Sequence, residues 1–447
     1  AAAAAAAGAA APAEDAASTL VPGLRTRPDA YLEPALQDGM SRRAVAIEMA
    51  ATQSGWCVGH CHVSSQCTLP PFTSHPHPTP HAPQLTPEEE AEVRVDGREV
   101  LAAGGATPAG RAALTAAWTK RGYAVLSIDE STWAPIDAMF AAWRAFCETL
   151  PSEAKWACIA NADSAGYMEV PGLFEQYNFV MQGGLGTPAE AERGSWRTRP
   201  DGTAGITGTA TLAERDGAAV AYPFPTAPPL ADTFRAALLA YYDHMSGIGR
   251  AVITTALAGL GVSAAAGSPA ADAVAALFDA RPLPVGEWSN ADIKMFRYYR
   301  RGAPGDEDDG SQVGEIHVDV GLTTCIPLAS TPGLQVLDKH AAVWVDLERQ
   351  RRPRDLLVFP SDVFRVLTAG YLGGTVHRVL RTRGAERISI PFIMRPPSAA
   401  RIAPLPRAGT AFEDPATPTA SIAGVDCARY ALHVLPSTRH FAYRLAR

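Results

Sequence analysis

The sequence has little charge and no long apolar run, and each shortage argues against a class of protein. Charged residues make up 19% of the 447 residues, and 39 basic against 46 acidic residues give a net charge of −7. An acidic surface does not suit a phosphate backbone, so we expect no nucleic-acid partner. We find no apolar run long enough to span a bilayer, so we expect no membrane association. The 47% of hydrophobic residues do allow a substantial core.

Cysteines are also scarce, and their number is odd. Seven cysteines in a chain of this size do not make a disulfide scaffold, so reduced thiols and a cytoplasmic protein are the simpler interpretation. The first residues lack the basic and Leu-rich parts of a secretory signal. Arginines between residues 25 and 43 leave an organelle transit peptide as the alternative.

A Cys/His-rich segment, residues 57–81, contains the stretch CVGHCHVSSQC followed by three more histidines. Cysteine and histidine at short spacing can bind zinc. The segment has no paired CxxC and no visible helix or strand that would hold ligands rigid. We therefore interpret it as a disordered, compositionally biased segment rather than a zinc site.

The rest of the chain divides into regions that differ in composition and in hydrophobic periodicity. Apolar residues at helical spacing predict helices at 111–120, 137–150 and 231–260, and YAVLSI (123–128) reads as a buried strand. From residue 285, short β-rich runs alternate with Gly, Pro and Asp, which favours a sandwich or jelly roll over a βαβ fold. The predicted regions are a disordered Ala/Pro/His-rich leader (1–106), an α/β region (107–284) with a loop insertion near 183–230, a β domain (285–400) and a C-terminal tail or helix (401–447).

Two histidines and an aspartate in the β domain form the pattern of a metal site. His317 and Asp319 are two residues apart, so on a strand their side chains share a face. His377 follows after enough residues for several strands to bring the chain back. Two His and one carboxylate make the facial triad of non-haem Fe(II) oxygenases, which leaves positions open on an octahedral ion.

A second pattern, Arg387-Ile388-Ser389, predicts an anion site. Arg387 and Ser389 share one strand face, and Ile388 and Ile390 take the other, so the Arg face should be the barrel interior. Burying a guanidinium is unfavourable unless it pairs with an anion. The paired N–H groups of the guanidinium suit a carboxylate, which can accept two hydrogen bonds from them. A dicarboxylate such as 2-oxoglutarate could chelate iron at one end and pair with Arg387 at the other.

Together these motifs resemble the isopenicillin N synthase-like group of Fe(II)/2-oxoglutarate-dependent dioxygenases. Residues 315–394 are similar to the HxD, GLQV, W-V, GD, LT-G, HRV and RxS series of that family, in order and at fitting spacings. RGYAVL (121–126) and GYMEVPGLFEQYNF (166–179) are similar to its N-terminal region. The sequence departs from the family at Ser361, where Gly is usual before Asp362.

The resemblance implies a mainly β fold with flanking helices, in which a double-stranded β-helix (jelly roll) core follows an N-terminal α-rich region. It implies that His317, Asp319 and His377 bind Fe(II) and that Arg387 and Ser389 hold the distal carboxylate of 2-oxoglutarate. MFRYYR resembles the family's N-Y-Y-P stretch, which would bring Tyr299 to a cosubstrate carboxylate, although arginines replace the usual Asn and Pro.

The activity that the resemblance implies is oxidation of a small molecule, by hydroxylation or desaturation, while 2-oxoglutarate and O2 become succinate and CO2. The chemistry would be borne by iron, with no separate acid or base residue, and ascorbate is a candidate reductant. We expect a monomer. A 2-oxoglutarate-independent iron oxidase of the same fold and a non-catalytic binding protein remain as alternatives, and the sequence does not identify the substrate.

Overall fold

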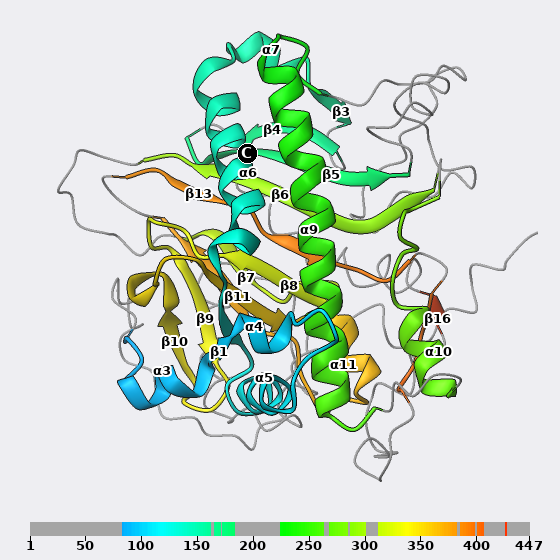
Figure 1. Cartoon of the computed structure of the whole chain (residues 1–447). Coiled ribbons are helices and arrows are strands. Elements are labelled where there is room, and N and C mark those ends of the chain that lie inside the picture. The colour runs from blue at the N-terminus through cyan, green and yellow to red at the C-terminus, as the bar shows by residue number, and fades with distance from the viewer. Residues whose placement is uncertain are drawn as a thin grey trace, which may run out of the picture.

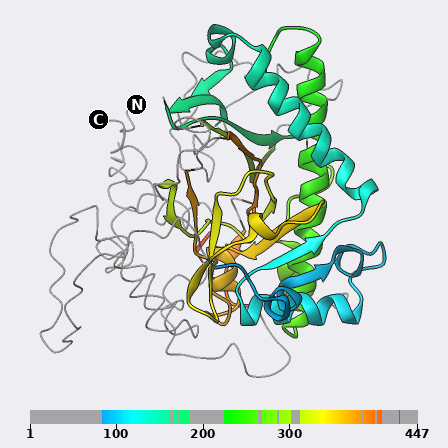
Figure 2. The same cartoon turned by 90° about the vertical axis from the view of Figure 1, so that its left-hand side faces the viewer.

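The computed structural model describes residues 83–161, 165–170, 172–183, 224–262, 268–284, 287–300, 312–381, 385–397, 400–405 and 425–426. In this part of the chain, helices cover one face of a large sheet, and a smaller sheet packs on its other side (Figures 1 and 2). The Cys/His-rich segment, nearly all of the predicted 183–230 insertion and most of the C-terminal tail lie outside the described residues.

The described helices are α3 (Pro87–Val93), α4 (Gly97–Val100), α5 (Pro108–Lys120), α6 (Glu130–Thr149), α7 (Ser152–Trp156), α9 (Leu230–Gly259), α10 (Pro269–Ala275), the 3-10 turn η1 (Leu347–Gln350) and α11 (Asp362–Leu367). The strands of the large sheet, in spatial order, are β1 (Arg94–Asp96), β2 (Ala124–Ser127), β11 (Asp355–Pro360), β8 (Thr323–Pro327), β14 (Phe392–Met394), β6 (Trp288–Tyr298), β5 (Phe174–Gln182), β4 (Ala165–Val170) and β3 (Ile159–Asn161), with β13 (Arg387–Ser389) also paired to β6. The smaller sheet runs β10 (Val343–Asp346), β9 (Leu334–Asp338), β12 (His377–Leu380) and β7 (Gln312–His317), and β15 (Arg401–Ile402) pairs with β16 (Val425–Asp426).

The helical layer is held by apolar stripes that repeat every three or four residues. In α5 and α6 the largest of these side chains, Trp118, Trp143 and Phe146, are fully buried. They pack with the apolar face of α9, the long helix in Figure 1, against the outer face of the large sheet. Gly122, with φ of 90°, follows α5, and its N–H donates to the carbonyls of the last turn. Among the described residues, no helix is long and apolar enough to cross a membrane.

The jelly roll is closed by the large and small sheets facing one another. A separate apolar cluster, which includes Val336 of β9 and Phe359 of β11, fills the space between them. Strand β12 pairs with both β7 and β9, so His377 lies opposite His317 on one side and Val336 on the other. The fold class predicted from the short β-rich runs is thereby confirmed, and the pairing of β12 with β7 brings the two predicted histidine ligands together.

Residues 83–106, which were predicted as part of the disordered leader, contain two helices and a strand, and this corrects the predicted leader over these residues. Thr86 and Glu89 form a capping box that starts α3, and Pro87 occupies its first turn. Glu88, Glu89 and Glu90 lie in the first turn of α3, where carboxylates are favourable. Strand β1 then adds to the sheet beside β2, and Arg94 makes a bidentate bond at 2.8 and 2.9 Å to the buried Asp355.

A three-stranded meander, β3 to β5, extends the large sheet beyond β6 and has no clear alternation of apolar and polar residues in the sequence. Strand β5 carries Glu175 into the interior, where it is 1% exposed. Lys155 Nζ lies 2.8 Å and Arg297 Nη1 lies 2.9 Å from its carboxylate oxygens. Because these two cations pair with the buried carboxylate, β5 can hold Glu175 in the interior, although hydrophobic patterning alone would predict that a glutamate is exposed to solvent.

Candidate metal centre

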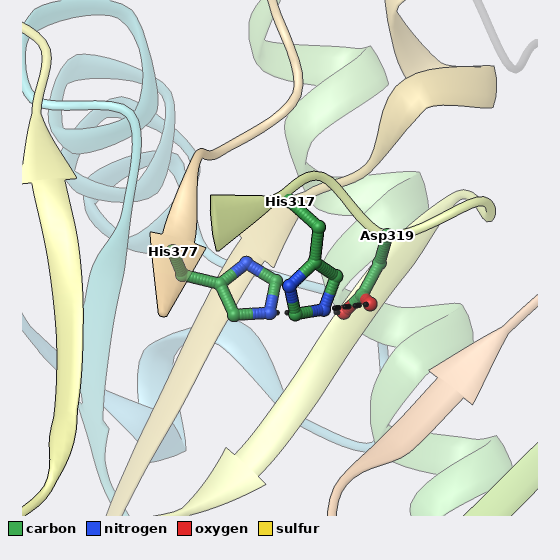
Figure 3. A group of neighbouring side chains, drawn as sticks. All are labelled: His317, Asp319 and His377. Carbon is green, nitrogen blue, oxygen red and sulfur yellow. Dashed lines mark ion pairs between the residues drawn. The ribbon is translucent and has the colours of Figure 1, made fainter. Parts of the chain in front are cut away.

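Three side chains from the small sheet and the loop after it converge on one point. His317 lies at the end of β7, His377 begins β12, and Asp319 follows β7 by two residues, as Figure 3 shows. One potential ligand atom from each lies within 4.8 Å of the others. His317 Nε2 is 3.4 Å from Asp319 Oδ1, and His377 Nε2 is 3.7 Å from Asp319 Oδ2. Adjacent ligands on one ion are roughly 3 Å apart at metal–ligand distances of about 2.1 Å, so the set fits a divalent cation.

Contrary to the prediction, His317 and Asp319 do not lie on one strand, because β7 ends at His317. Asp319 instead lies in the loop 318–322, which is fastened to the N-terminus of α11. The Asp362 N–H donates to the Asp319 carbonyl at 2.9 Å, and the Val363 N–H donates to the Gly321 carbonyl at 2.9 Å. The carboxylate thus has a fixed position that comes from this loop rather than from strand alternation.

Neighbouring polar groups orient two of the three ligands. The Thr324 hydroxyl donates to Asp319 Oδ2 at 2.6 Å, which leaves Oδ1 toward His317. Nδ1 of His377 lies 3.1 Å from the Thr375 carbonyl, so a proton on Nδ1 leaves Nε2 with its lone pair toward the aspartate side. Such contacts fix the tautomer and ring orientation of metal-binding histidines.

The electrostatics of the cluster place these two ligands in the protonation states that a metal requires. Burial lowers the pKa of His377 to about 4, with His317 acting in the same direction, so the ring is neutral at neutral pH. Burial alone would raise the pKa of Asp319, but the adjacent histidines and the Thr324 hydrogen bond lower it below its ordinary value. Metal ligands bind as a neutral imidazole and an ionised carboxylate.

One side of the cluster is open to solvent. The His317 side chain is 37% exposed, against 5% for His377 and 10% for Asp319. The Phe359 ring lies 5.0 Å from the His377 ring on the interior side. An ion here would therefore be held against an apolar interior and approached from the side of His317.

The predicted anion site lies on the inner face of the jelly roll. Arg387 and Ser389 are buried, and Arg387 pairs with Tyr298 and Ser389 with Phe296 across β13 and β6. The Arg387 guanidinium, however, already meets a carboxylate of the chain itself. Its Nη2 and Nε lie 2.6 and 3.1 Å from the two oxygens of Glu348 in η1. The Arg387 fork is therefore occupied, and the predicted role of Arg387 and Ser389 in cosubstrate binding stays a prediction.

Tyr299 does not lie beside these residues. Its hydroxyl donates to Glu169 Oε1 at 2.7 Å, on the meander side of the sheet. The neighbouring Tyr298 instead faces the interior, with the Arg387 guanidinium carbon 5.4 Å from its ring centre. The resemblance to the family motif predicted a role for Tyr299, whereas the register of β6 with β13 places Tyr298 beside Arg387.

The sequence did not predict that Thr324, Glu348 and Tyr298 lie beside the candidate site residues. Because successive side chains of a strand lie on opposite faces, the buried strand TTCIP (323–327) predicts that Thr324 lies on the face opposite to that of Cys325. No local pattern identifies Glu348, because it precedes a run of charged residues that looks like a solvent-exposed loop.

Residues 291–396 match the model of the 2OG-Fe(II) oxygenase superfamily. Gibberellin 3-beta-dioxygenase 1 of Oryza sativa subsp. japonica is 36% identical over 94 residues, which are 21% of this chain and 24% of that protein. A 2-oxoglutarate-Fe(II) type oxidoreductase of Aspergillus fumigatus is 33% identical over 109 residues, 24% of this chain and 31% of its own length. The matched segments thus span about a quarter to a third of these relatives.

Solved structures agree on the fold. A 2OG-Fe(II) oxygenase family protein from Caulobacter crescentus superposes with a TM-score of 0.52 at 19% identity and covers 74% of this chain and 94% of that one. At this identity the likeness concerns the fold alone. The family match includes the three residues that converge, so the segment 291–396 is similar to the 2OG-Fe(II) oxygenase superfamily.

Proposed function

We propose that this protein is an Fe(II)- and 2-oxoglutarate-dependent oxygenase that oxidises a small molecule while 2-oxoglutarate and O2 are converted to succinate and CO2. The observation that carries the proposal is the convergence of His317, Asp319 and His377 inside the jelly roll of the superfamily domain. Iron bound there would supply the redox chemistry with O2. The names of the relatives, which include gibberellin 3-beta-dioxygenase and leucoanthocyanidin dioxygenase, support a small organic substrate.

The chain's own residues would bind the metal, orient its ligands and limit access of water. Two imidazoles and one carboxylate hold the ion from one side, and Thr324 and the Thr375 carbonyl keep Asp319 and His377 in place. The apolar cluster between the sheets provides a dry interior behind the ion. None of the described residues near the ligands is assigned an acid or base role.

A second function is favoured by one observation, the pairing of Arg387 with Glu348. An iron oxidase of the same fold that does not use 2-oxoglutarate would have no need of a free guanidinium at this position. Measuring succinate against O2 consumed distinguishes the two: equimolar succinate supports the first function, and O2 uptake without succinate supports the second.

Narrower assignments belong to the same proposal. The series of motifs from HVD to RIS supports the isopenicillin N synthase-like group within the superfamily. Cys147, Cys158 and Cys325 are free and buried, which supports the reducing conditions of the cytoplasm. The net charge of −7 supports the absence of a nucleic-acid partner, and we propose a monomer.

The test uses the full chain under anaerobic conditions. Addition of Fe(II) and then 2-oxoglutarate should give a weak visible charge-transfer band, and His377→Ala should abolish it because one ligand is lost. His340→Ala is the matched control, since His340 lies in the turn between β9 and β10 and is not part of the ligand cluster. A band that survives in His377→Ala, or no band in the native chain, would contradict the proposal.

A further inference from the structure

The Arg387–Glu348 pair is one of the most deeply buried ion pairs in the described part of the chain. The side chains are 1% and 0% exposed, and the closest approach is 2.6 Å. The two contacts at 2.6 and 3.1 Å join both carboxylate oxygens to the guanidinium edge. This is the bidentate geometry in which an arginine fork binds an external carboxylate.

Glu348 is held in this position by more than Arg387. Its Oε1 accepts the Ala329 N–H at 3.0 Å, and its Oε2 accepts the Leu334 N–H at 2.8 Å. Gly333 lies directly against the arginine, because a Cβ at that position would be 2.9 Å from Arg387 Cδ. The stretch 329–334 between β8 and β9 therefore encloses the pair, so Glu348 is a built-in partner rather than a side chain that happens to lie nearby.

The remaining chemistry of the fork does not suit a second carboxylate. Within the described residues, Arg387 Nη1 is buried and has no hydrogen-bond partner, so one donor is left over. The pair as a whole carries no net charge. A distal carboxylate directed at Nη1 would gain one hydrogen bond and would meet the Glu348 anion in a medium that screens charge poorly. An uncharged chain end would meet no such repulsion.

We propose that Glu348 is an internal competitor for the Arg387 fork and sets the selectivity of the site for its 2-oxo acid cosubstrate. A dicarboxylate such as 2-oxoglutarate must displace Glu348 before its distal carboxylate reaches the fork. A 2-oxo acid with an apolar end binds without this rearrangement. The inference rests on the proposed function, because it assumes that a 2-oxo acid chelates the metal at the triad.

The test is a direct binding measurement. Mn(II)-loaded protein is titrated calorimetrically with 2-oxoglutarate and with 2-oxopentanoate, which has the same chain length without the distal carboxylate. In the native chain the two acids should bind within threefold of one another, or 2-oxopentanoate should bind more tightly. Glu348→Gln should tighten 2-oxoglutarate binding tenfold or more and change 2-oxopentanoate binding less than threefold.

Asp338→Asn is the matched control, because Asp338 is a fully buried carboxylate of β9 that pairs with Arg121 and not with Arg387. It should leave both affinities unchanged. A native chain that prefers 2-oxoglutarate tenfold or more, or a Glu348→Gln variant with unaltered selectivity, would overturn the inference and leave the proposed function intact. The native measurement decides the matter even if Glu348→Gln does not fold. If neither acid binds to native protein or to folded Glu348→Gln, the proposed function itself fails.

Discussion

The hydrogen bond from Thr324 to Asp319 should control how tightly the site holds a metal. Thr324→Val replaces the hydroxyl by a methyl group of similar size and removes the 2.6 Å bond to Asp319 Oδ2. Thr324 is fully buried, so no solvent takes over the role. The aspartate would lose the contact that directs Oδ1 toward His317, and the open site would no longer be preorganised.

The magnitude follows from the charge on the acceptor. A hydrogen bond to an ionised group is worth about 1.5–3 kcal/mol. Since about 1.4 kcal/mol corresponds to a factor of ten, metal affinity should fall roughly 10- to 100-fold. Loss of an outer contact to a metal ligand has effects of this size in other proteins.

The assay is calorimetric titration of metal-free protein with Mn(II). Thr323→Val is the control, because Thr323 is an equally buried neighbour whose hydroxyl donates to the Phe359 carbonyl at 2.8 Å and not to Asp319. It should lower stability without changing metal affinity. Equal affinity in Thr324→Val and the native chain, or an equal loss in both variants, would refute the reasoning.

Three further results are expected. Burial lowers the folded-state pKa of His244 below 6.5, so the unfolded chain takes up the proton first and the free energy of unfolding falls as the pH drops below 6.5. His244→Gln should weaken this pH dependence when the free energy of unfolding is measured in urea at pH values on either side of 6.5. An unchanged dependence of the unfolding free energy on pH would contradict this expectation. Phe364→Ala should lower the free energy of unfolding by about 3–5 kcal/mol, because the buried ring packs edge-on against Trp118 with ring centres 5.4 Å apart. Val343→Ala, at a position that is 38% exposed, should lower it by less than about 1 kcal/mol. Mn(II) at about 100 times its Kd should raise the free energy of unfolding of the native chain by about 2.7 kcal/mol. The His377→Ala variant should show no increase when the native chain and the variant are each unfolded in urea with and without the metal.

The sequence predicted those features that depend on local pattern or on ordered motifs. The long helix at 231–260 is α9 within one residue at each end, because its apolar stripe repeats regularly over the whole length. The triad followed from the motif series, although Asp319 reaches its position through a loop fastened to α11. The order of motifs along the chain thus identified three side chains that converge in the structure, even where the assumed strand geometry was wrong.

Features that depend on distant partners could not be predicted in the same way. Glu175 and Glu348 are charged residues that look solvent-exposed in sequence, and each is buried only because cations from other elements meet it. The register of β6 against β13 decides whether Tyr298 or Tyr299 faces Arg387, and a shift of one residue reverses the answer. Long-range pairing of this kind leaves no trace in a single sequence.

Strand β1 has a practical consequence for anyone who shortens this protein. It covers the outer side of β2, which would otherwise present unpaired N–H and C=O groups. A truncation at residue 107, where composition alone suggests a boundary, would open that backbone to strand addition by other molecules. It would also remove Arg94 from the buried Asp355 carboxylate at the start of β11. Expression trials should therefore keep the residues from Leu85 onward, and aggregation of a shorter product would say nothing about the catalytic domain itself.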